Sequence, residues 1–91
     1  MQNNFKVSSF QVNLTKQQGY YVTINGQPEG REHPIRVKKF LKLDKLQEIL
    51  PLLIEGQLPI IILGRREQSD FEQKHAIQYY DFLVASNDLG L

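Results

Sequence analysis

The sequence predicts a mainly β domain of the α+β class, a five-stranded barrel with one short helix between its third and fourth strands. Three observations support this prediction. Short runs rich in β-branched and aromatic residues recur along the chain, turn-forming residues separate these runs, and only residues 44–55 carry the spacing of an amphipathic helix. With 91 residues, the chain is expected to form a single domain over residues 1–91.

Composition narrows the class of protein. Hydrophobic residues make up 41% and charged residues 23%, which is typical of soluble globular domains. No apolar run is long enough to span a membrane, and residues 1–4 lack the features of a signal peptide, so we expect a cytoplasmic protein without a membrane partner. The absence of cysteine fits a reducing compartment. Because the net charge is only +1, a polyanionic partner would have to be recognised by local basic clusters.

The first two expected strands form a hairpin. In residues 5–14 the apolar positions change parity across the Ser8-Ser9 pair, which predicts a β-bulge or bend there. A polar, glycine-ended turn follows, and residues 20–24 are expected to form the second strand. Residues 25–33 begin with the turn dipeptide Asn-Gly and also contain proline, so we expect a long loop.

A third strand is expected to begin near Pro34. Ile35 and Val37 fall on one face of this strand, and basic and aromatic side chains alternate with them on the other. The residues on that second face are Arg36, Lys38 and Phe40.

The only helical pattern follows the third strand. Asp44 is expected to cap the helix with Gln47 in the capping-box position, and Gly56 to end it in a left-handed conformation. Because Pro51 lacks a backbone donor, we expect a kink or two short turns rather than one straight helix. The apolar face of the helix is expected to comprise Leu46, Ile49, Leu50, Leu53 and Ile54.

Two strands complete the predicted barrel. Residues 58–63 are apolar throughout, so we expect a strand that is covered on both faces or packed at an interface. A polar loop containing Phe71 follows, and residues 79–84 form an aromatic last strand. The resulting order of strands and helix is that of the OB-fold, a Greek-key barrel. If residues 34–43 were a loop, the order would instead be that of a ubiquitin-like β-grasp domain, and this alternative stays open.

About half the chain, residues 40–84, resembles the second half of bacterial single-stranded DNA-binding proteins and related primosomal OB proteins. The shared pieces are a short helix, a glycine-led strand that ends in Gly64-Arg65, a polar loop and the aromatic strand 79–85. The resemblance implies binding of single-stranded nucleic acid, with DNA favoured over RNA.

Binding a single strand without sequence preference requires cations that contact phosphates and aromatic rings on which bases stack. In an OB-fold, strands two and three and the loop between strands four and five line the usual binding face. The expected nucleic-acid-binding residues are Tyr21, Arg36, Lys38, Phe40, Arg65, Arg66, Phe71 and Lys74. The alternative is an ordinary solvated face, on which Glu67, Asp70 and Glu72 reduce the positive charge of the loop. Phe71 has polar neighbours, so it is expected either in a functional or subunit contact or packed on the barrel rim.

Two classes of function are compatible with these patterns. The first is a small, non-catalytic nucleic-acid-binding protein that acts as a homodimer or higher homo-oligomer. The second is a protein-protein interaction module or structural subunit, in which residues 58–63 or Tyr79-Tyr80 pair with a partner along a strand edge. Catalysis is not expected, and neither is a cofactor or metal, because His33 and His75 lack metal-ligand spacing and no phosphate-binding loop occurs.

Overall fold

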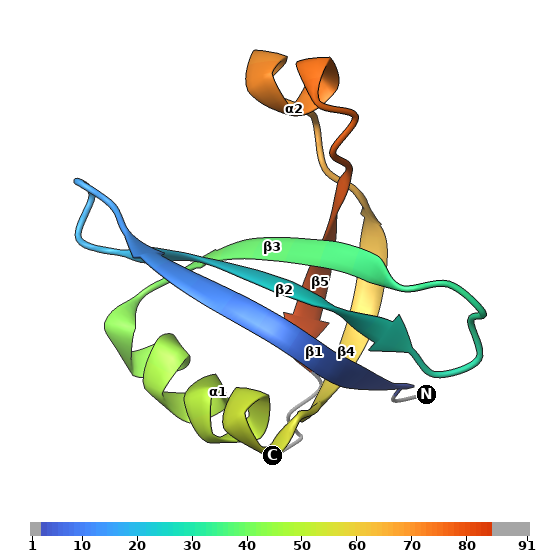
Figure 1. The fold of residues 1–91 in the computed structure, drawn as a ribbon. Coiled ribbons are helices and arrows are strands. Elements are labelled where there is room, and N and C mark those ends of the chain that lie inside the picture. Colours follow the sequence, from blue (N-terminus) through green and yellow to red (C-terminus); the bar gives the residue numbers. More distant parts are fainter. Residues whose placement is uncertain (1–2, 85–91) are drawn as a thin grey trace.

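The computed structural model describes residues 3–84 (Figure 1). Its elements follow one another in the predicted order, with one additional short helix before the last strand. They are β1 (Asn3–Leu14), β2 (Tyr20–Pro28), β3 (Ile35–Leu41), α1 (Leu43–Glu55), β4 (Gln57–Arg65), α2 (Asp70–Lys74) and β5 (Tyr79–Val84).

The five strands close into a barrel in the order β1-β2-β3-β5-β4. All neighbouring strands are antiparallel except β3 and β5, which are parallel. With α1 placed between β3 and β4, this is the arrangement of a small OB-like barrel, and the predicted fold class is confirmed. The β-grasp alternative is wrong, because residues 35–41 form a strand that pairs with both β2 and β5.

The predicted bulge in β1 is present at Ser8. The register with β2 shifts between Val7, which lies opposite Gly26, and Ser9, which lies opposite Asn25. Two side-chain hydrogen bonds hold the bulge: Ser8 Oγ donates to the backbone oxygen of Asn25 at 2.9 Å, and Asn25 Nδ2 donates to Ser9 Oγ at 3.0 Å. The extra residue lets one strand serve two faces of the barrel.

The expected turn at Asn25-Gly26 is wrong, because β2 continues through this pair to Pro28. Gly26 lies opposite the bulged part of β1, where the two backbones approach closely. A Cβ atom at Gly26 would collide with the carbonyl oxygen of Lys6. Glycine is therefore required here by a close backbone approach within a sheet rather than by a turn.

A single apolar core fills the barrel, and α1 closes one end of it (Figure 1). Alternate residues of each strand point inward, as the pleat of a β-strand requires. The fully buried side chains are those of Phe5, Val22, Ile24, Val37, Leu58, Ile60 and Phe82. The helix adds Leu46, Ile49 and Leu53 to this core. Within residues 3–84, neither helix is long and apolar enough to cross a membrane.

Helix α1 differs from the prediction at its start, although its end is as expected. The residue at the N-cap position is Lys42, which makes no capping hydrogen bond, so the expected cap at Asp44 is wrong. Asp44 lies in the first turn, where a carboxylate interacts favourably with the helix dipole. Gly56 ends the helix in the left-handed region with φ 89°, as predicted.

The helix is continuous through Pro51, so the expectation of two short turns is wrong. Pro51 removes one backbone hydrogen bond of the helix. The buried side chains of Ile49 and Leu53, one on each side of Pro51, offset this loss because they anchor both halves of the helix in the core. Ile54 was expected on the buried face, but it is 71% exposed. The buried face of α1 is therefore narrower than the apolar face that the residue spacing predicted.

Strand β4 is buried on one face only. Leu58 and Ile60 point into the core, whereas Ile61 and Leu63 are exposed beside Leu83 of β5. The expectation of a strand covered on both faces is therefore wrong for the described part of the chain.

The last strand has little free edge at its start. Tyr80 pairs with Val37 of β3 on one side and with Arg65 of β4 on the other. Tyr79 lies opposite Arg36 of β3. Because the barrel itself uses these positions, the start of β5 does not offer the edge on which the expected pairing of Tyr79-Tyr80 with a partner depended.

Candidate nucleic-acid interface

The centre of the candidate interface is an aromatic pair on the outer face of β2 and β3. Tyr21 and Phe40 lie directly opposite each other in the antiparallel register. Their ring centroids are 5.4 Å apart, with the planes at 68°, an edge-to-face arrangement. The ring of Phe40 also covers Gly19, where a Cβ atom would overlap it. The sheet register thus brings two of the predicted aromatic residues together.

Lys38 extends this pair to a third strand. Its neighbour Val37 is fully buried, so Lys38 points to the outer face of β3. The Lys38 ammonium nitrogen is 5.0 Å from the ring centroid of Tyr21 and 5.1 Å from that of Tyr79. Both distances are typical of cation–π interactions. One cation therefore lies between aromatic rings of β2 and β5.

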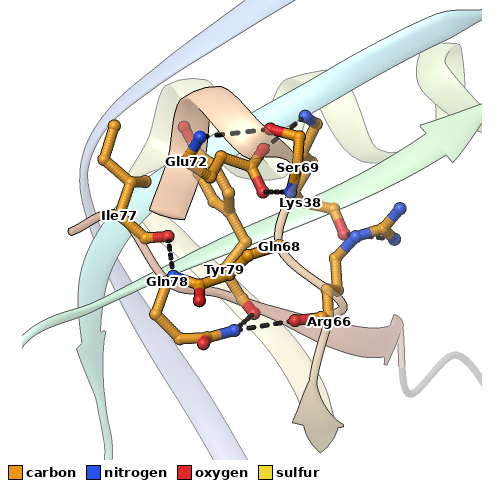
Figure 2. A network of polar contacts seen from close by, with 8 residues as sticks. All are labelled: Lys38, Arg66, Gln68, Ser69, Glu72, Ile77, Gln78 and Tyr79. Atoms are coloured by element: carbon orange, nitrogen blue, oxygen red, sulfur yellow. Dashed lines mark hydrogen bonds and ion pairs between the residues drawn. The ribbon is translucent and has the colours of Figure 1, made fainter. Parts of the chain in front are cut away.

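Glu72 links helix α2 to Lys38 of β3 (Figure 2). Glu72 Oε2 is 3.3 Å from Lys38 Nζ, while Glu72 Oε1 accepts a 3.1 Å hydrogen bond from the backbone N–H of Ser69. Ser69 Oγ in turn accepts from the backbone N–H of Glu72 at 3.2 Å, which completes a capping box. The Glu72 side chain is only 13% exposed. One carboxylate thus caps the helix and also forms an ion pair with β3.

Amide side chains tie the two ends of the α2 segment together (Figure 2). Gln78 Nε2 donates to the carbonyl oxygens of Arg66 at 2.9 Å and Tyr79 at 2.8 Å. Gln68 Nε2 donates to the carbonyl oxygen of Ile77 at 2.6 Å. These bonds position the segment that an OB-fold places beside the binding face.

Arg66 braces the sheet rather than pointing freely into solvent. Arg66 Nη1 donates to the carbonyl oxygen of Lys38 at 3.2 Å and lies 3.8 Å from Asp81 Oδ1. Asp81 is also 3.3 Å from Lys39 Nζ. Part of the expected positive charge is therefore neutralised within the protein. Ion pairs of this kind near the surface contribute only about 0–1 kcal/mol each.

The other two predicted residues of this segment lie on α2. Phe71 is 63% exposed and stacks on His75, with ring centroids 4.2 Å apart and planes at 29°. The alternative of Phe71 packing on the barrel rim is therefore wrong. Lys74 is exposed in the last turn of the helix.

Arg36 and Arg65 are both exposed but lie on different strands. Arg36 shares the outer face of β3 with Lys38 and lies opposite Tyr79 of β5. Arg65 lies opposite Tyr80 at the end of β4. Neither arginine forms an ion pair among residues 3–84.

The eight predicted residues therefore fall into three sets. The outer face of β2 and β3 carries Tyr21, Arg36, Lys38 and Phe40; the segment around α2 carries Arg66, Phe71 and Lys74; and Arg65 stands apart from both. Contacts to Lys38 link the first two sets. Although Arg65 adjoins Arg66 in the chain, its side chain forms no ion pair or hydrogen bond with the other seven within the described residues.

This chain matches no protein-family model, no curated protein and no solved structure. What the interface does is therefore inferred from its own side chains and from the barrel architecture.

Sequence reasoning missed two residues of this interface. Tyr79 was assigned to the last strand but not to the binding face, and its proximity to Lys38 depends on the parallel pairing of β3 with β5. Glu72 was expected only to reduce the charge of the loop, whereas it pairs specifically with Lys38. The Ser-x-x-Glu spacing of Ser69 and Glu72 was a signal that could have indicated α2.

Within residues 3–84, no three His, Asp or Glu side chains gather closely enough to hold a metal ion. The charged groups around Lys38 form ion pairs with one another.

Proposed function

We propose that the protein is a small, non-catalytic binder of single-stranded nucleic acid, with DNA favoured over RNA. Its binding surface is the aromatic–basic face, which we define as Tyr21, Arg36, Lys38, Phe40 and Tyr79. The observation that carries the proposal is the position of the Lys38 ammonium, 5.0 and 5.1 Å from two tyrosine rings on the outer face of the barrel. Alternating cations and aromatic rings are what a single strand requires of its binding surface.

The physical basis is stacking combined with phosphate contacts. Each base that stacks on an aromatic side chain contributes about 1–3 kcal/mol, and every base has a face that can stack. Arg36 and Lys38 lie two residues apart on β3, hence about 7 Å apart along the strand. At this spacing, the two cations can contact successive phosphates of one bound strand. A phosphate that approaches Lys38 would compete with Glu72, whose side chain is 13% exposed and also caps α2.

The α2 segment supplies the second part of the proposed surface. Phe71 presents an exposed ring, and Lys74 an exposed ammonium group, on the element that the Lys38–Glu72 pair links to β3. In OB-folds the corresponding loop contributes to binding oligonucleotides. Arg65 and Arg66 would add positive charge at the start of this segment.

One barrel with so few basic residues would bind a strand only weakly. The chain carries 11 lysine and arginine residues against 10 acidic ones, and two of the face's neighbouring cations, Lys39 and Arg66, already contact Asp81. Linking two sites raises the effective concentration of the second. We therefore propose that the protein acts as a homodimer or higher homo-oligomer.

A fluorescence-anisotropy titration tests this function. The probes are a labelled single strand of about thirty bases, long enough for more than one OB site, and a duplex of the same length. We expect tighter binding to the single strand and a steep loss of affinity between low and moderate salt, because phosphate contacts release counterions. Absence of binding at low salt would contradict the proposal.

Three variants test the position of the binding surface in the same titration. Lys74→Ala removes an exposed lysine beside Phe71, and Lys45→Ala removes one on α1, where it pairs with Glu48. We expect Lys74→Ala to weaken binding and Lys45→Ala to leave it nearly unchanged. Arg65→Ala with Arg66→Ala should also weaken binding, and unchanged affinity after that double substitution would remove both residues from the surface.

A protein-interaction module is the second candidate, and one observation favours it. Ile61, Leu63 and Leu83 are 41%, 51% and 48% exposed, respectively, and Ile61 lies opposite Leu83 in the sheet. Exposed apolar side chains that adjoin one another often mark a contact with another protein. Leu63→Thr keeps a β-favouring residue while removing apolar area. If light scattering detects an assembly that this variant disrupts while wild type binds no strand, the second function is supported.

A further inference from the structure

An open cavity of about 560 Å³ lies at the Arg36 end of the aromatic–basic face. Four parts of the barrel form it: the bulge of β1, the middle of β2, the start of β3 and the segment that leads into β5. The side chains that matter for binding are those of Ser8, Asn25, Arg36, Gln78 and Tyr80. Its volume is within the range of small-molecule sites.

The side chains of the cavity favour a ligand that has a negative charge and a flat ring. Arg36 lines it and is exposed, and none of the lining residues carries a carboxylate. A second guanidinium is near, since the central carbon of Arg31 is 6.0 Å from the ring centroid of Tyr80. Tyr80 packs against the core and also lines the cavity, so its ring is held in place. Arginine and an aromatic ring together suit a phosphate joined to a base.

The amide groups of the cavity are oriented by bonds within the protein. Asn25 Nδ2 donates to Ser9 Oγ at 3.0 Å, and Gln78 Nε2 donates to the carbonyl oxygens of Arg66 and Tyr79 at 2.9 and 2.8 Å. The oxygens Asn25 Oδ1 and Gln78 Oε1 accept no hydrogen bond from residues 3–84. Two fixed acceptors are therefore left to receive N–H groups of a ligand.

We infer that this cavity binds one nucleotide, with its base against Tyr80 and its phosphate against Arg36. The amide oxygens accept from the exocyclic amino group of adenine or cytosine. Thymine lacks that group, and its one ring N–H is flanked by two carbonyl oxygens, so it fits the acceptors less well. The inference rests on the proposed function where the nucleotide belongs to a bound strand, although a free mononucleotide presents the same chemistry.

Because of the position of Arg36, one single strand could contact both the aromatic–basic face and the cavity. Arg36 belongs to the aromatic–basic face and to the cavity, and it lies opposite Asn25 of β2 and Tyr79 of β5. A strand that stacks on Tyr21 and Tyr79 would thus place a following nucleotide at the cavity. We expect strands with adenine or cytosine to bind more tightly than strands of thymine alone.

A titration followed by the backbone amide signals in NMR tests the inference. The ligands are dAMP, dTMP and inorganic phosphate, each added to wild type, to Arg36→Ala and to Lys6→Ala. Arg36 is exposed, so its substitution should not disturb the fold. Lys6 is the matched control, because it lines a different cavity at the start of β1.

With wild type, we expect dAMP to shift the amide signals of Arg36, Gln78 and Tyr80 with a Kd on the order of millimolar, as for a small ligand with few contacts. Arg36→Ala should raise this Kd by about fivefold or more, as expected for the loss of a charged hydrogen bond. Lys6→Ala should leave it unchanged, and dTMP and phosphate should bind more weakly than dAMP.

The other possible outcomes distinguish a failure of the cavity inference from a failure of the proposed function. Strand binding without a dAMP shift at these three amides would overturn the cavity and leave the function in place. A dAMP shift without strand binding would support the cavity as a site for a free nucleotide and overturn the function. Equal shifts from dAMP and phosphate would overturn base recognition, since only the anion would then be bound.

Discussion

At the scale of single residues, Lys38 joins three parts of the candidate interface through one ammonium group. The group is 3.3 Å from the Glu72 carboxylate of α2 and lies near the rings of Tyr21 and Tyr79 on two other strands. Its side chain is 25% exposed. Lys38 therefore links these parts of the surface and, under the proposed function, would also contact a phosphate.

Substituting Lys38 tests whether this residue contacts a phosphate of the strand in addition to linking parts of the surface. Lys38→Met keeps the length of the side chain but removes the charge, so we expect weaker strand binding and a salt dependence lower by about 0.7 in slope, the contribution of one phosphate contact. Affinities measured at several salt concentrations give the slope. The control is Lys45→Met, which removes an equal charge from α1. An identical change in the slope of both variants would show that Lys38 makes no specific phosphate contact.

Gly26 is a second residue whose identity the barrel constrains. Gly26→Ala places a Cβ atom against the Lys6 carbonyl oxygen, and backbone cannot move aside as a flexible side chain could. We expect the free energy of unfolding to fall by about 3 kcal/mol, as in other over-packed positions. Urea denaturation measures this change.

The comparison variant is Gly30→Ala. A Cβ atom at Gly30 meets no neighbour, and only its φ of +86° is unfavourable for alanine, so we expect a loss of about 1 kcal/mol. If Gly26→Ala were no more destabilising than Gly30→Ala, the close approach of β1 and β2 would not be what requires glycine at this position.

At the scale of elements, α2 depends on polar contacts rather than on the core. None of its residues is buried, and its first turn is held by the capping box of Ser69 and Glu72. A helix of this kind opens locally at a lower cost than the whole barrel. Its stability can therefore be changed separately from that of the fold.

Ser69→Ala removes half of the capping box. Loss of such a cap costs about 1 kcal/mol, so we expect the amide hydrogens of Gln73 and His75 to exchange about fivefold faster. Exchange in the central strand β2 should be unchanged, since α2 contributes no buried residue. Unaltered exchange at both α2 amides would mean that the cap does not hold the helix in solution.

Helix α1 provides a matched pair of isoleucines. Ile49 is 3% exposed and Ile54 is 71% exposed, although both were expected on the buried face. We expect Ile49→Ala to destabilise the protein by about 2–5 kcal/mol and Ile54→Ala by less than about 0.5 kcal/mol. Thermal or urea unfolding of the two variants compares them directly. Similar losses would indicate that the helix packs with a different face.

At the scale of the whole molecule, the fold was predictable because local signals agreed with one another. The parity change at Ser8-Ser9, the glycine at position 56 and the alternation around Val37 each indicated an element that the structure contains. Their order then indicated a closed barrel. Consistency between local preferences and the global fold is what makes such a prediction possible.

The interface was less predictable because it depends on contacts between distant segments. Tyr21 and Phe40 were expected together, and their register brings them together. The contact of Lys38 with Tyr79 required knowledge of the parallel pair β3 and β5, which no local pattern contains. Gly26 resembled a turn residue because sequence alone does not reveal how closely a bulged neighbour approaches.

Photochemical cross-linking tests most directly whether the aromatic–basic face binds single strands. A strand carrying photoreactive bases would be irradiated with the protein, and the attached peptides identified by mass spectrometry. We expect the strand to attach to peptides that contain Tyr21, residues 36–40 or Tyr79, and to do so less at higher salt. Attachment only to the exposed apolar residues of β4, or no attachment above that of a duplex, would contradict the proposed function.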